Sequence, residues 1–382
     1  MAELAFWCSV LLVLYAYVGY PCALQLVSHF RNRPIRKAAI TPRVSFIITA
    51  YNEEARIRAK IENTLAQRYP AAHLEIIVAS DCSADRTDDI VREYSHRIRL
   101  VRAPERRGKE AAQLLAIDRC AGDILIFSDV ATALAPDGVS TIVRNFADGT
   151  VGCVSSIDRF IDDDGRLSGE GAYVRYEMFL RMLETRVNSV VGLSGSFFAA
   201  RREVCANWAA DRQSDFSTVL SAVELGFRGV LDVESAGYYR NIVDLKHERQ
   251  RKVRTVVRGI GVLGRNLRML NPIRHGLFAW QLASHKLCRW LVPFAMIGAA
   301  VSNATLAAHS HVYLALFCLQ LAFYAAAAGG GWVGMRVLQI PSFLVLANVA
   351  VLTAWFRYAR GERITRWDPS DRLAALPQTS AR

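Results

Sequence analysis

Hydrophobic residues are distributed unevenly along the 382 residues, and their pattern divides the chain into three parts. Residues 4–26 are nearly uncharged, and three further apolar windows lie near the other end, at 291–308, 312–328 and 337–356. Each window is about as long as a helix that crosses the hydrocarbon core of a bilayer. The pattern therefore predicts one membrane helix near the beginning of the chain and further membrane helices near its end.

Between these windows, strand-like runs alternate with helical patterns. Strands are predicted at 44–51, 74–80, 97–101 and 123–128, and helices at 52–65, 83–94, 108–120, from Pro136 onward and, as a core helix, at 169–191. The runs are continuous rather than alternating in polarity, which is typical of strands buried on both faces of a parallel sheet. Strands and helices that alternate at this spacing predict βαβ units and therefore an α/β domain with a mostly parallel central sheet.

Acidic residues follow three of the predicted strands: Glu53, Asp81 and Asp129. Open α/β sheets place their ligands at the carboxyl ends of the strands, where carboxylates suit ribose hydroxyls, a base edge or a divalent cation on phosphates. The plain alternative is a helix cap or a turn residue at each position. Neither G-x-G-x-x-G nor a P-loop follows the first strand, which argues against a standard dehydrogenase or NTPase.

Charge and cysteine content narrow the class of protein further. The chain is 52% hydrophobic and carries a net charge of +12, with a pI near 9.5 and a mean hydropathy of +0.16. Basic residues gather beside the apolar windows and at 246–268, which favours contact with membrane lipids and argues against a nucleic-acid partner. The eight scattered cysteines form no C-x-x-C pair, which argues against a zinc site and fits a reducing cytosol.

The distribution of basic residues also predicts an orientation, but only for the first part of the chain. The basic cluster at 31–43 follows the first apolar window, so the positive-inside rule places the α/β domain in the cytosol. Three crossings at the other end would leave the arginines at 357–366 outside, against the same rule. Either one window does not fully span or the rule fails, and Pro341 makes a broken segment one solution.

Six short motifs occur in an order that resembles family 2 glycosyltransferases. They are Val44–Glu54, Val78–Thr87, Gly108-Lys109, Phe127-Ser128-Asp129, Ser214-Asp215-Phe216 and the segment around Lys252-Val253-Arg254. The run His285–Trp290 is similar to the junction before the C-terminal membrane helices of bacterial polysaccharide-forming members. The resemblance covers roughly residues 40–360.

The resemblance implies a GT-A-type nucleotide-diphosphosugar transferase domain. In that family the matching positions would bind the nucleotide sugar: Ala50, Tyr51, Glu53, Asp81, Lys109 and Asp129. Asp129 would also hold a divalent cation, Mg²⁺ or Mn²⁺, as the first acid of the D-x-D motif. The third position of this motif is Ala131, so metal dependence rests on a single carboxylate and on the oxygens of phosphate and water.

The same resemblance assigns the catalytic residues. Asp215 matches the catalytic base, and Arg251 and Arg254 match a basic segment that closes over the leaving diphosphate. Processive members carry Q-x-x-R-W here, whereas this chain has Gln250-Arg251-Lys252-Val253-Arg254-Thr255 without tryptophan. The alternative for these charges is a helix that lies on the membrane surface.

We therefore expect a transmembrane anchor at 1–30, a cytosolic transferase domain at 31–273, an interfacial segment at 274–290, membrane helices at 291–360 and a tail at 361–382. The expected function is inverting transfer of a sugar, from a UDP-sugar by preference, to a lipid-linked or glycan acceptor at a bacterial plasma membrane, with multi-pass topology. The alternatives are a processive polysaccharide synthase and a catalytically degenerate subunit that binds nucleotide sugar.

Overall fold

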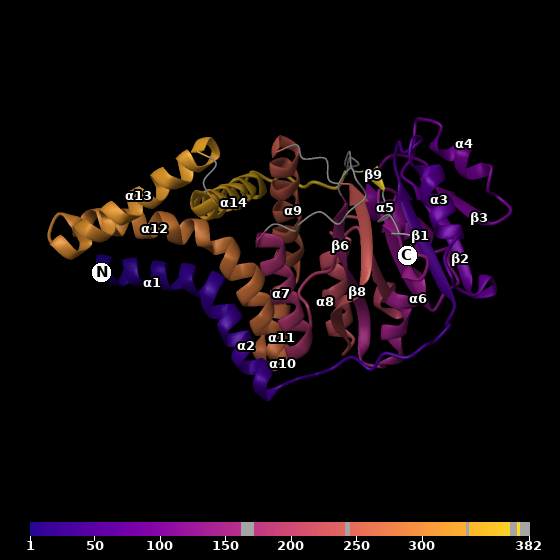
Figure 1. The fold of residues 1–382 in the computed structure, drawn as a ribbon, viewed down its shortest axis with the longest axis horizontal. Coiled ribbons are helices and arrows are strands. Elements are labelled where there is room, and N and C mark those ends of the chain that lie inside the picture. Colours follow the sequence, from indigo (N-terminus) through magenta and orange to yellow (C-terminus); the bar gives the residue numbers. More distant parts are fainter. Residues whose placement is uncertain (162–171, 241–244, 334–335, 367–372, 375–382) are drawn as a thin grey trace, which may run out of the picture. The chain divides into compact units, whose positions relative to one another are not determined.

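The computed structural model describes residues 1–161, 172–240, 245–333, 336–366 and 373–374, and the chain forms two compact units. The helical unit comprises Met1–Val27 and Asp244–Arg363, and the sheet unit comprises Ser28–Val243 and Ile364–Arg382 (Figure 1). The domain boundary expected at residue 273 thus differs from the division at 243, because the helix after residue 244 groups with the apolar helices. The residues after Arg363, expected as a separate tail, group with the sheet unit.

The sheet unit is built on a nine-stranded sheet in the described residues, with the order β3-β2-β1-β4-β7-β6-β8-β5 and with β9 beside β8. Strands β1 (Val44–Ala50), β2 (Leu74–Ser80), β3 (Ile98–Arg102) and β4 (Ile124–Asp129) run parallel. Strand β7 (Phe197–Arg201) is antiparallel to β4 and to β6 (Val151–Ile161), which runs parallel to β8 (Arg228–Arg240). The short strands β5 (Ala133–Leu134) and β9 (Leu373–Ala374) are antiparallel to β8. The predicted mostly parallel sheet is confirmed.

Helices predicted after the first four strands are present: α3 (Ile57–Leu65), α4 (Thr87–Arg92), α5 (Lys109–Ile117) and α6 (Gly138–Val143). The sheet unit also contains α7 (Ala172–Val187), within the predicted core helix, and α8 (Ser214–Glu224), with 3-10 turns η2 (Ala71–His73), η3 (Arg144–Ala147) and η4 (Arg202–Cys205). Gly169, where the core helix was expected to begin, lies outside the described residues. Helix α3 begins at Ile57, later than the predicted start at residue 52. Asn52 has a φ of 52°, and its Oδ1 accepts a hydrogen bond from Ala84 N at 2.8 Å.

The core of the sheet unit explains why these runs become strands. All seven residues of β1 are buried, and Phe46 and Ile48 pack in one cluster with Ile57 and Ile61 of α3. A strand in the middle of a sheet that is covered on both faces needs apolar side chains on both. The apolar run at 44–50 therefore fixes β1 at the centre of the sheet, between β2 and β4.

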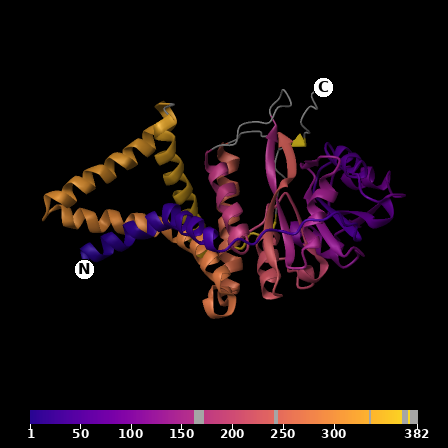
Figure 2. The ribbon, with the colours of Figure 1, turned by 60° about the horizontal axis from the view of Figure 1, so that its bottom comes forward.

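The helical unit contains the apolar windows. Its elements are α1 (Ala2–Leu14), η1 (Tyr15–Gly19), α2 (Tyr20–Phe30), α9 (Leu245–Arg265), η5 (Leu267–Leu270), α10 (Pro272–His275), α11 (Leu277–Leu282), η6 (Ala283–Cys288), α12 (Arg289–Ala307), α13 (His311–Val333) and α14 (Arg336–Ala359). Figure 2 shows α12, α13 and α14 connected end to end around a triangle.

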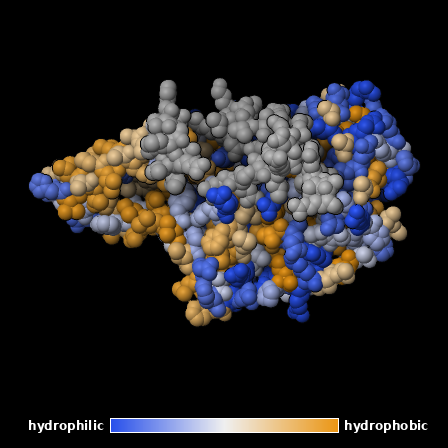
Figure 3. Space-filling view, viewed as in Figure 1, coloured by the Kyte–Doolittle hydropathy of each residue, from blue (hydrophilic) through white to orange (hydrophobic). Residues whose placement is uncertain are grey.

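Four helical stretches of the described residues are long and apolar enough to cross a membrane: Ala2–Phe30, Leu277–Ala307, His311–Gly329 and Pro341–Ala359. Large apolar side chains of these stretches are exposed, including Leu11, Val301 and Leu319, and hydrophobic residues dominate this part of the surface in Figure 3. An exposed apolar surface of this extent is typical of a protein that meets lipid or another apolar surface.

Candidate active site

The carboxyl ends of three parallel strands bring the predicted site residues together. The register pairs Ala50 of β1 with Ser80 of β2, and Thr49 of β1 with Asp129 of β4. Asp81 continues the β2 ladder, because its backbone N–H donates to Ala50 O at 2.9 Å. The sheet therefore holds Ala50, Asp81 and Asp129 at one edge, as the sequence predicts.

Asp81 is fully buried and is held by the loop before α5. Its Oδ1 accepts a hydrogen bond from Arg107 N at 2.9 Å, and its Oδ2 accepts one from Gly108 N at 2.9 Å. Burial raises the pKa of Asp81, and these two backbone N–H groups oppose the rise. A carboxylate has about four lone-pair sites, so Asp81 can still accept a further donor such as the edge of a base.

Two further features surround Asp81 and the neighbouring Tyr51. The guanidinium of Arg106 lies 3.8 Å from the ring centroid of Tyr51, which forms a flat cationic surface. The segment after Arg363 lies against Gly108: a Cβ added at Gly108 would be 2.2 Å from Thr365 O. Arg366, the next residue, lowers the pKa of Asp81 through its charge. The C-terminal segment thus contacts the part of the site that is predicted to hold the nucleotide.

Glu53 lies in the loop after β1 and is 3% exposed. Its Oε2 accepts a hydrogen bond from Arg56 Nε at 2.6 Å, and its backbone N–H donates to Thr87 Oγ1 at 2.7 Å. Burial raises the pKa of Glu53 to about 7, the Arg56 charge opposes the rise, and the charge of Asp129 adds to it. Glu53 and Asp129 are therefore electrostatic neighbours.

Asp129 lies between two lysines. Lys109 Nζ donates to Asp129 Oδ1 at 2.5 Å and to Gly195 O at 2.8 Å. Lys60, which is 1% exposed, donates to Ser128 Oγ at 2.7 Å and to Thr132 O at 2.6 Å. Burial raises the pKa of Asp129, and the Lys109 ammonium opposes the rise. Burial also lowers the pKa of Lys60 to about 7, and the charge of Asp129 opposes that change.

Asp215 lies next to the loop that contains Gly195, whose carbonyl accepts the hydrogen bond from Lys109. It lies in the first turn of α8, and its carbonyl accepts a hydrogen bond from Leu193 N at 3.0 Å. A Cβ added at Gly195 would be 3.0 Å from Asp215 Oδ2, so any side chain at position 195 would press on this carboxylate. Gly195 thus accepts a hydrogen bond from Lys109 through its carbonyl, and the space that a Cβ would need at this glycine borders the Asp215 carboxylate. The loop joins the Asp129–Lys109 pair to the predicted base.

Sequence reasoning missed two residues of this site. Asp158 of β6 accepts hydrogen bonds from Ser194 Oγ at 2.9 Å and from Ser196 Oγ, and its charge raises the pKa of Asp129. The available signal was one acid in a largely buried strand. Lys60 is the other residue missed. Its signal was a lysine on the buried face of α3, beside Ile57 and Ile61.

Arg251 and Arg254 lie on α9 in the helical unit, so their assignment to the leaving diphosphate remains a prediction. Lys252, between them, places Nζ 5.0 Å from the ring centroid of Phe343 within the same unit.

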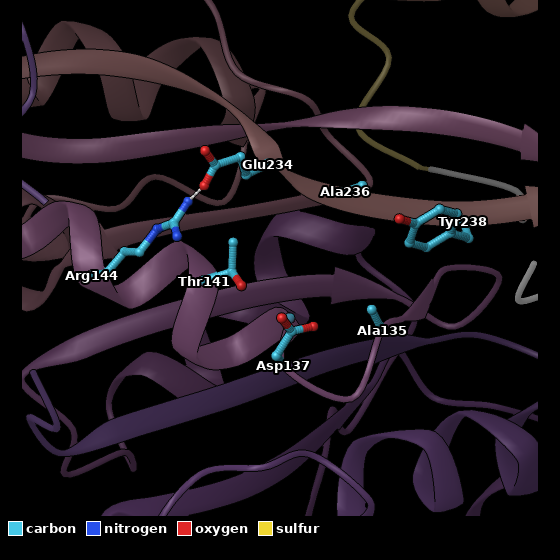
Figure 4. A pocket seen from close by; sticks show the side chains of 8 residues that line it. Ala135, Asp137, Thr141, Arg144, Glu234, Ala236 and Tyr238 are labelled. Atoms are coloured by element: carbon cyan, nitrogen blue, oxygen red, sulfur yellow. Dashed lines mark ion pairs between the residues drawn. The ribbon is translucent and has the colours of Figure 1, made fainter. Parts of the chain in front are cut away.

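A surface pocket of about 270 Å³ elsewhere in the sheet unit contains none of the predicted site residues. It is lined by Ala135, Asp137, Gly138, Thr141, Arg144, Glu234, Ala236 and Tyr238. Figure 4 shows Arg144 and Glu234 paired at one end of it. This ion pair closes that end of the pocket with opposite charges, so the pocket offers no excess charge for a diphosphate there.

Few side chains near Asp129 could bind a metal ion. In the described part of the chain no group of three or more His, Cys, Asp or Glu side chains could hold a metal ion. Ala131, which takes the place of the second acid of the motif, is buried and supplies no ligand. A Mg²⁺ or Mn²⁺ ion fits this site only as a partner of Asp129 and of a bound diphosphate, whose oxygens would complete the coordination shell.

Comparison with known proteins agrees with this geometry. The family described as Glycosyl transferase family 2 matches residues 45–208. An N-acetylglucosaminyltransferase of Sinorhizobium fredii is 29% identical over 126 residues, which are 32% of this chain and 30% of that protein. An N-acetylglucosaminyltransferase of Mesorhizobium japonicum is 35% identical over 116 residues, 29% of this chain and 27% of that protein. The matched region thus spans less than a third of these relatives.

Among solved structures, a mannosyltransferase from Pyrobaculum calidifontis in complex with GDP-Man and Mn²⁺ has a TM-score of 0.75 and 22% identity. The alignment covers 95% of this chain and 100% of that one. The sheet unit therefore has the GT-A fold. Over residues 45–208 the chain is similar to family 2 glycosyltransferases.

Proposed function

We propose that this protein is a membrane-bound inverting glycosyltransferase that moves a sugar from a nucleotide-diphosphate sugar to a lipid-linked or glycan acceptor. The observation that carries the proposal is the connection of Asp129, Lys109, Gly195 and Asp215 at one end of the sheet. Lys109 of α5 and Asp215 of α8 both lie next to Gly195, which supports a role for the ammonium in anion binding beside a candidate base. The proposal also includes a location: the protein lies in a bacterial plasma membrane, with the sheet unit in the cytoplasm.

The donor nucleotide would lie along the ends of β1 and β2. The nucleobase of the donor would lie over Tyr51 and Arg106, and Asp81 would accept a hydrogen bond from the edge of the nucleobase. Burial favours the protonated form of Glu53 below about pH 7, so the Glu53 carboxyl could donate a hydrogen bond to a ribose or phosphate oxygen there. A UDP-sugar is the donor we favour from the family resemblance.

In the transfer step Asp215 would take the proton of the acceptor hydroxyl. The acceptor oxygen then forms a bond to the anomeric carbon, and the bond between that carbon and the diphosphate breaks on the opposite face, so the configuration inverts. The electron pair and the negative charge leave with the nucleoside diphosphate. Lys109 supplies a positive charge for that leaving group, and Arg251 and Arg254 are proposed to add theirs.

A divalent cation is part of the proposal. Asp129 would hold it together with the diphosphate, where it would neutralise charge on the leaving group. Because Lys109 already pairs with Asp129 Oδ1, the ion and the ammonium would share this carboxylate. We expect EDTA to lower nucleotide release and Mg²⁺ or Mn²⁺ to restore it. Full activity in excess EDTA would instead assign the charge stabilisation to the lysine and arginine side chains alone.

The test of the proposed function is a donor screen with the purified full-length protein in lipid nanodiscs. UDP- and GDP-sugars are supplied one at a time with a membrane lipid extract as the acceptor source, and the released nucleotide is measured. We expect release from one class of donor, with incorporation of labelled sugar into the lipid fraction. No release from any nucleotide sugar would contradict the proposal.

A further inference from the structure

Asp158, near the carboxyl end of β6, holds the loop that precedes β7. Its Oδ1 accepts hydrogen bonds from Ser194 Oγ at 2.9 Å and from Ser196 Oγ. The carbonyl of Ser196 in turn accepts a hydrogen bond from Asp129 N at 2.9 Å, and the charge of Asp158 raises the pKa of Asp129. Asp158 is therefore an electrostatic neighbour of the carboxylate that is proposed to meet the diphosphate, although no step of the proposed transfer uses it.

The second oxygen of Asp158 is available to a ligand. Among the described residues, nothing donates a hydrogen bond to Oδ2, and no basic side chain forms an ion pair with Asp158. The residue is half-buried, so part of it faces solvent. Two other acids of the site already have charged partners, because Lys109 pairs with Asp129 and Arg56 pairs with Glu53. A half-buried carboxylate oxygen without a partner favours a ligand that donates a hydrogen bond.

Asp158 also lies where the transferred sugar is expected. In an inverting transfer the acceptor oxygen and the leaving diphosphate lie on opposite faces of the anomeric carbon, so the sugar lies between the base and the diphosphate. Gly195 accepts a hydrogen bond from Lys109, and a Cβ added to it would be 3.0 Å from Asp215 Oδ2. The two serines that Asp158 holds are the residues on either side of Gly195. The Asp158 carboxylate therefore borders the space between the proposed diphosphate and the proposed base.

A sugar hydroxyl is the group that fits this oxygen. Hydroxyl groups donate hydrogen bonds, and such bonds to an ionised acceptor are shorter and stronger than bonds between neutral groups. The carboxylate of a uronate sugar can only accept hydrogen bonds, and the charge of Asp158 would repel it. The site would thus distinguish a neutral sugar from a uronate by repulsion as well as by attraction.

We propose that Asp158 is a specificity-determining residue: its Oδ2 accepts a hydrogen bond from a hydroxyl group of the donor sugar, and its charge excludes uronates. The donor is accordingly a neutral sugar. This inference rests on the proposed function and specifies the class of its donor. Because it concerns the sugar and not the nucleotide, donors that share one nucleotide can test it.

The experiment is isothermal titration of the purified full-length protein in nanodiscs, without an acceptor. The nucleotide sugar that the donor screen selects is titrated beside its free nucleoside diphosphate and beside the uronate that differs from it only at C6. UDP-glucose with UDP-glucuronate and GDP-mannose with GDP-mannuronate are such pairs. We expect the wild type to bind the neutral nucleotide sugar about 10-fold more tightly than the uronate.

The variant Asp158→Asn keeps the shape of the side chain and removes its charge, and its amide oxygen can still accept hydrogen bonds from the serines. Its affinity for the neutral nucleotide sugar should fall about 10-fold, as loss of a charge-assisted hydrogen bond predicts, and its preference over the uronate should fall at least as much. Its affinity for the free nucleoside diphosphate should stay within about twofold.

Asp148→Asn is the matched control, and it should bind all three ligands like the wild type. Asp148 precedes the other end of β6, and its Oδ1 accepts hydrogen bonds from Thr150 N at 2.9 Å and Thr150 Oγ1 at 2.8 Å. It therefore holds a turn through a backbone N–H and a hydroxyl group, outside the predicted site.

Each contrary outcome has its own meaning. Selection of a uronate in the donor screen, or equal wild-type affinity for the neutral sugar and the uronate, would overturn the inference without any variant. Equal losses for the nucleotide sugar and the free nucleoside diphosphate in Asp158→Asn would also overturn it, because Asp158 would then only hold the loop. Unchanged donor affinity with a raised KM for the acceptor would assign Asp158 to the acceptor instead. In all these cases nucleotide release still supports the proposed function, which only a lack of release from every nucleotide sugar contradicts.

Discussion

Asp129 is neighboured by two lysines that differ in their surroundings. Lys109 pairs directly with the carboxylate, whereas Lys60 lies behind it and donates to Ser128 and Thr132. A buried ammonium that only neutral groups contact directly is costly, which is why the pKa of Lys60 falls to about 7. Lys60 therefore changes charge close to physiological pH, directly beneath the predicted donor site.

This pKa gives a prediction for stability. The folded-state pKa of Lys60 is about 7, against 10.5 for an ordinary lysine. Between these two values the unfolded chain binds more protons than the folded one, so the free energy of unfolding rises with pH in this range. Lys60→Met should remove that rise. Melting temperatures from pH 7 to 9 check the prediction, and parallel curves for the wild type and the variant would contradict it.

The residue scale also shows what the sequence could and could not predict. Ala50, Tyr51, Glu53, Asp81, Lys109, Asp129 and Asp215 were predicted from their motifs, and the structure groups them at one end of the sheet. Asp158 and Lys60 were missed because each makes its contacts across the sheet rather than along the chain. Long-range contacts of this kind leave no local signature beyond a charged residue on the buried side of a strand or helix.

At the scale of elements, the strands were predictable because buried parallel strands require apolar residues on both faces. The start of α3 was not predictable. Asn52 adopts a left-handed backbone conformation, and its side chain accepts a hydrogen bond from the backbone of Ala84 in the loop after β2.

The loop that begins α5 supplies a second prediction. Gly108 has a φ of +106°, and a Cβ there would meet the backbone of Thr365 at 2.2 Å. Gly108→Ala should displace this loop, whose N–H groups hold Asp81, and lower donor affinity by about tenfold. Gly226→Ala is the matched control. Gly226 also has a positive φ, +85°, but nothing lies within 4 Å of the added Cβ. Isothermal titration with nucleotide measures the difference, and equal affinities in the two variants would contradict the account.

For the whole molecule, the chain segments that form the sheet unit limit the membrane topology, which the sequence left open. Ser28–Val243 and Ile364–Arg382 form one compact unit, and Thr365 touches Gly108. Two segments in contact lie on the same side of a membrane, so an even number of crossings must separate them. Three candidate stretches lie between them, at 277–307, 311–329 and 341–359. One of these, we infer, does not cross fully, which keeps the arginines at 357–366 on the same side as the basic cluster at 31–43.

This topology can be measured with reporter fusions after residue 243 and after residue 382. An alkaline phosphatase and a green fluorescent protein reporter should give the same side for both positions, the cytoplasm. Opposite sides for the two positions would contradict the inference. Pro341 was expected to allow a broken segment, but it lies inside α14, which is helical from Arg336 to Ala359.

The central claim is that Asp215 is the base that activates the acceptor, and one variant tests it most directly. In Asp215→Asn the amide cannot take the proton, so sugar transfer should fall by about 10²- to 10⁴-fold. Donor affinity should stay within about twofold, since the nucleotide is proposed to lie along β1 and β2, away from Asp215. Glu224→Gln, at the other end of α8, is the control and should transfer like the wild type. Wild-type transfer in Asp215→Asn would contradict the account.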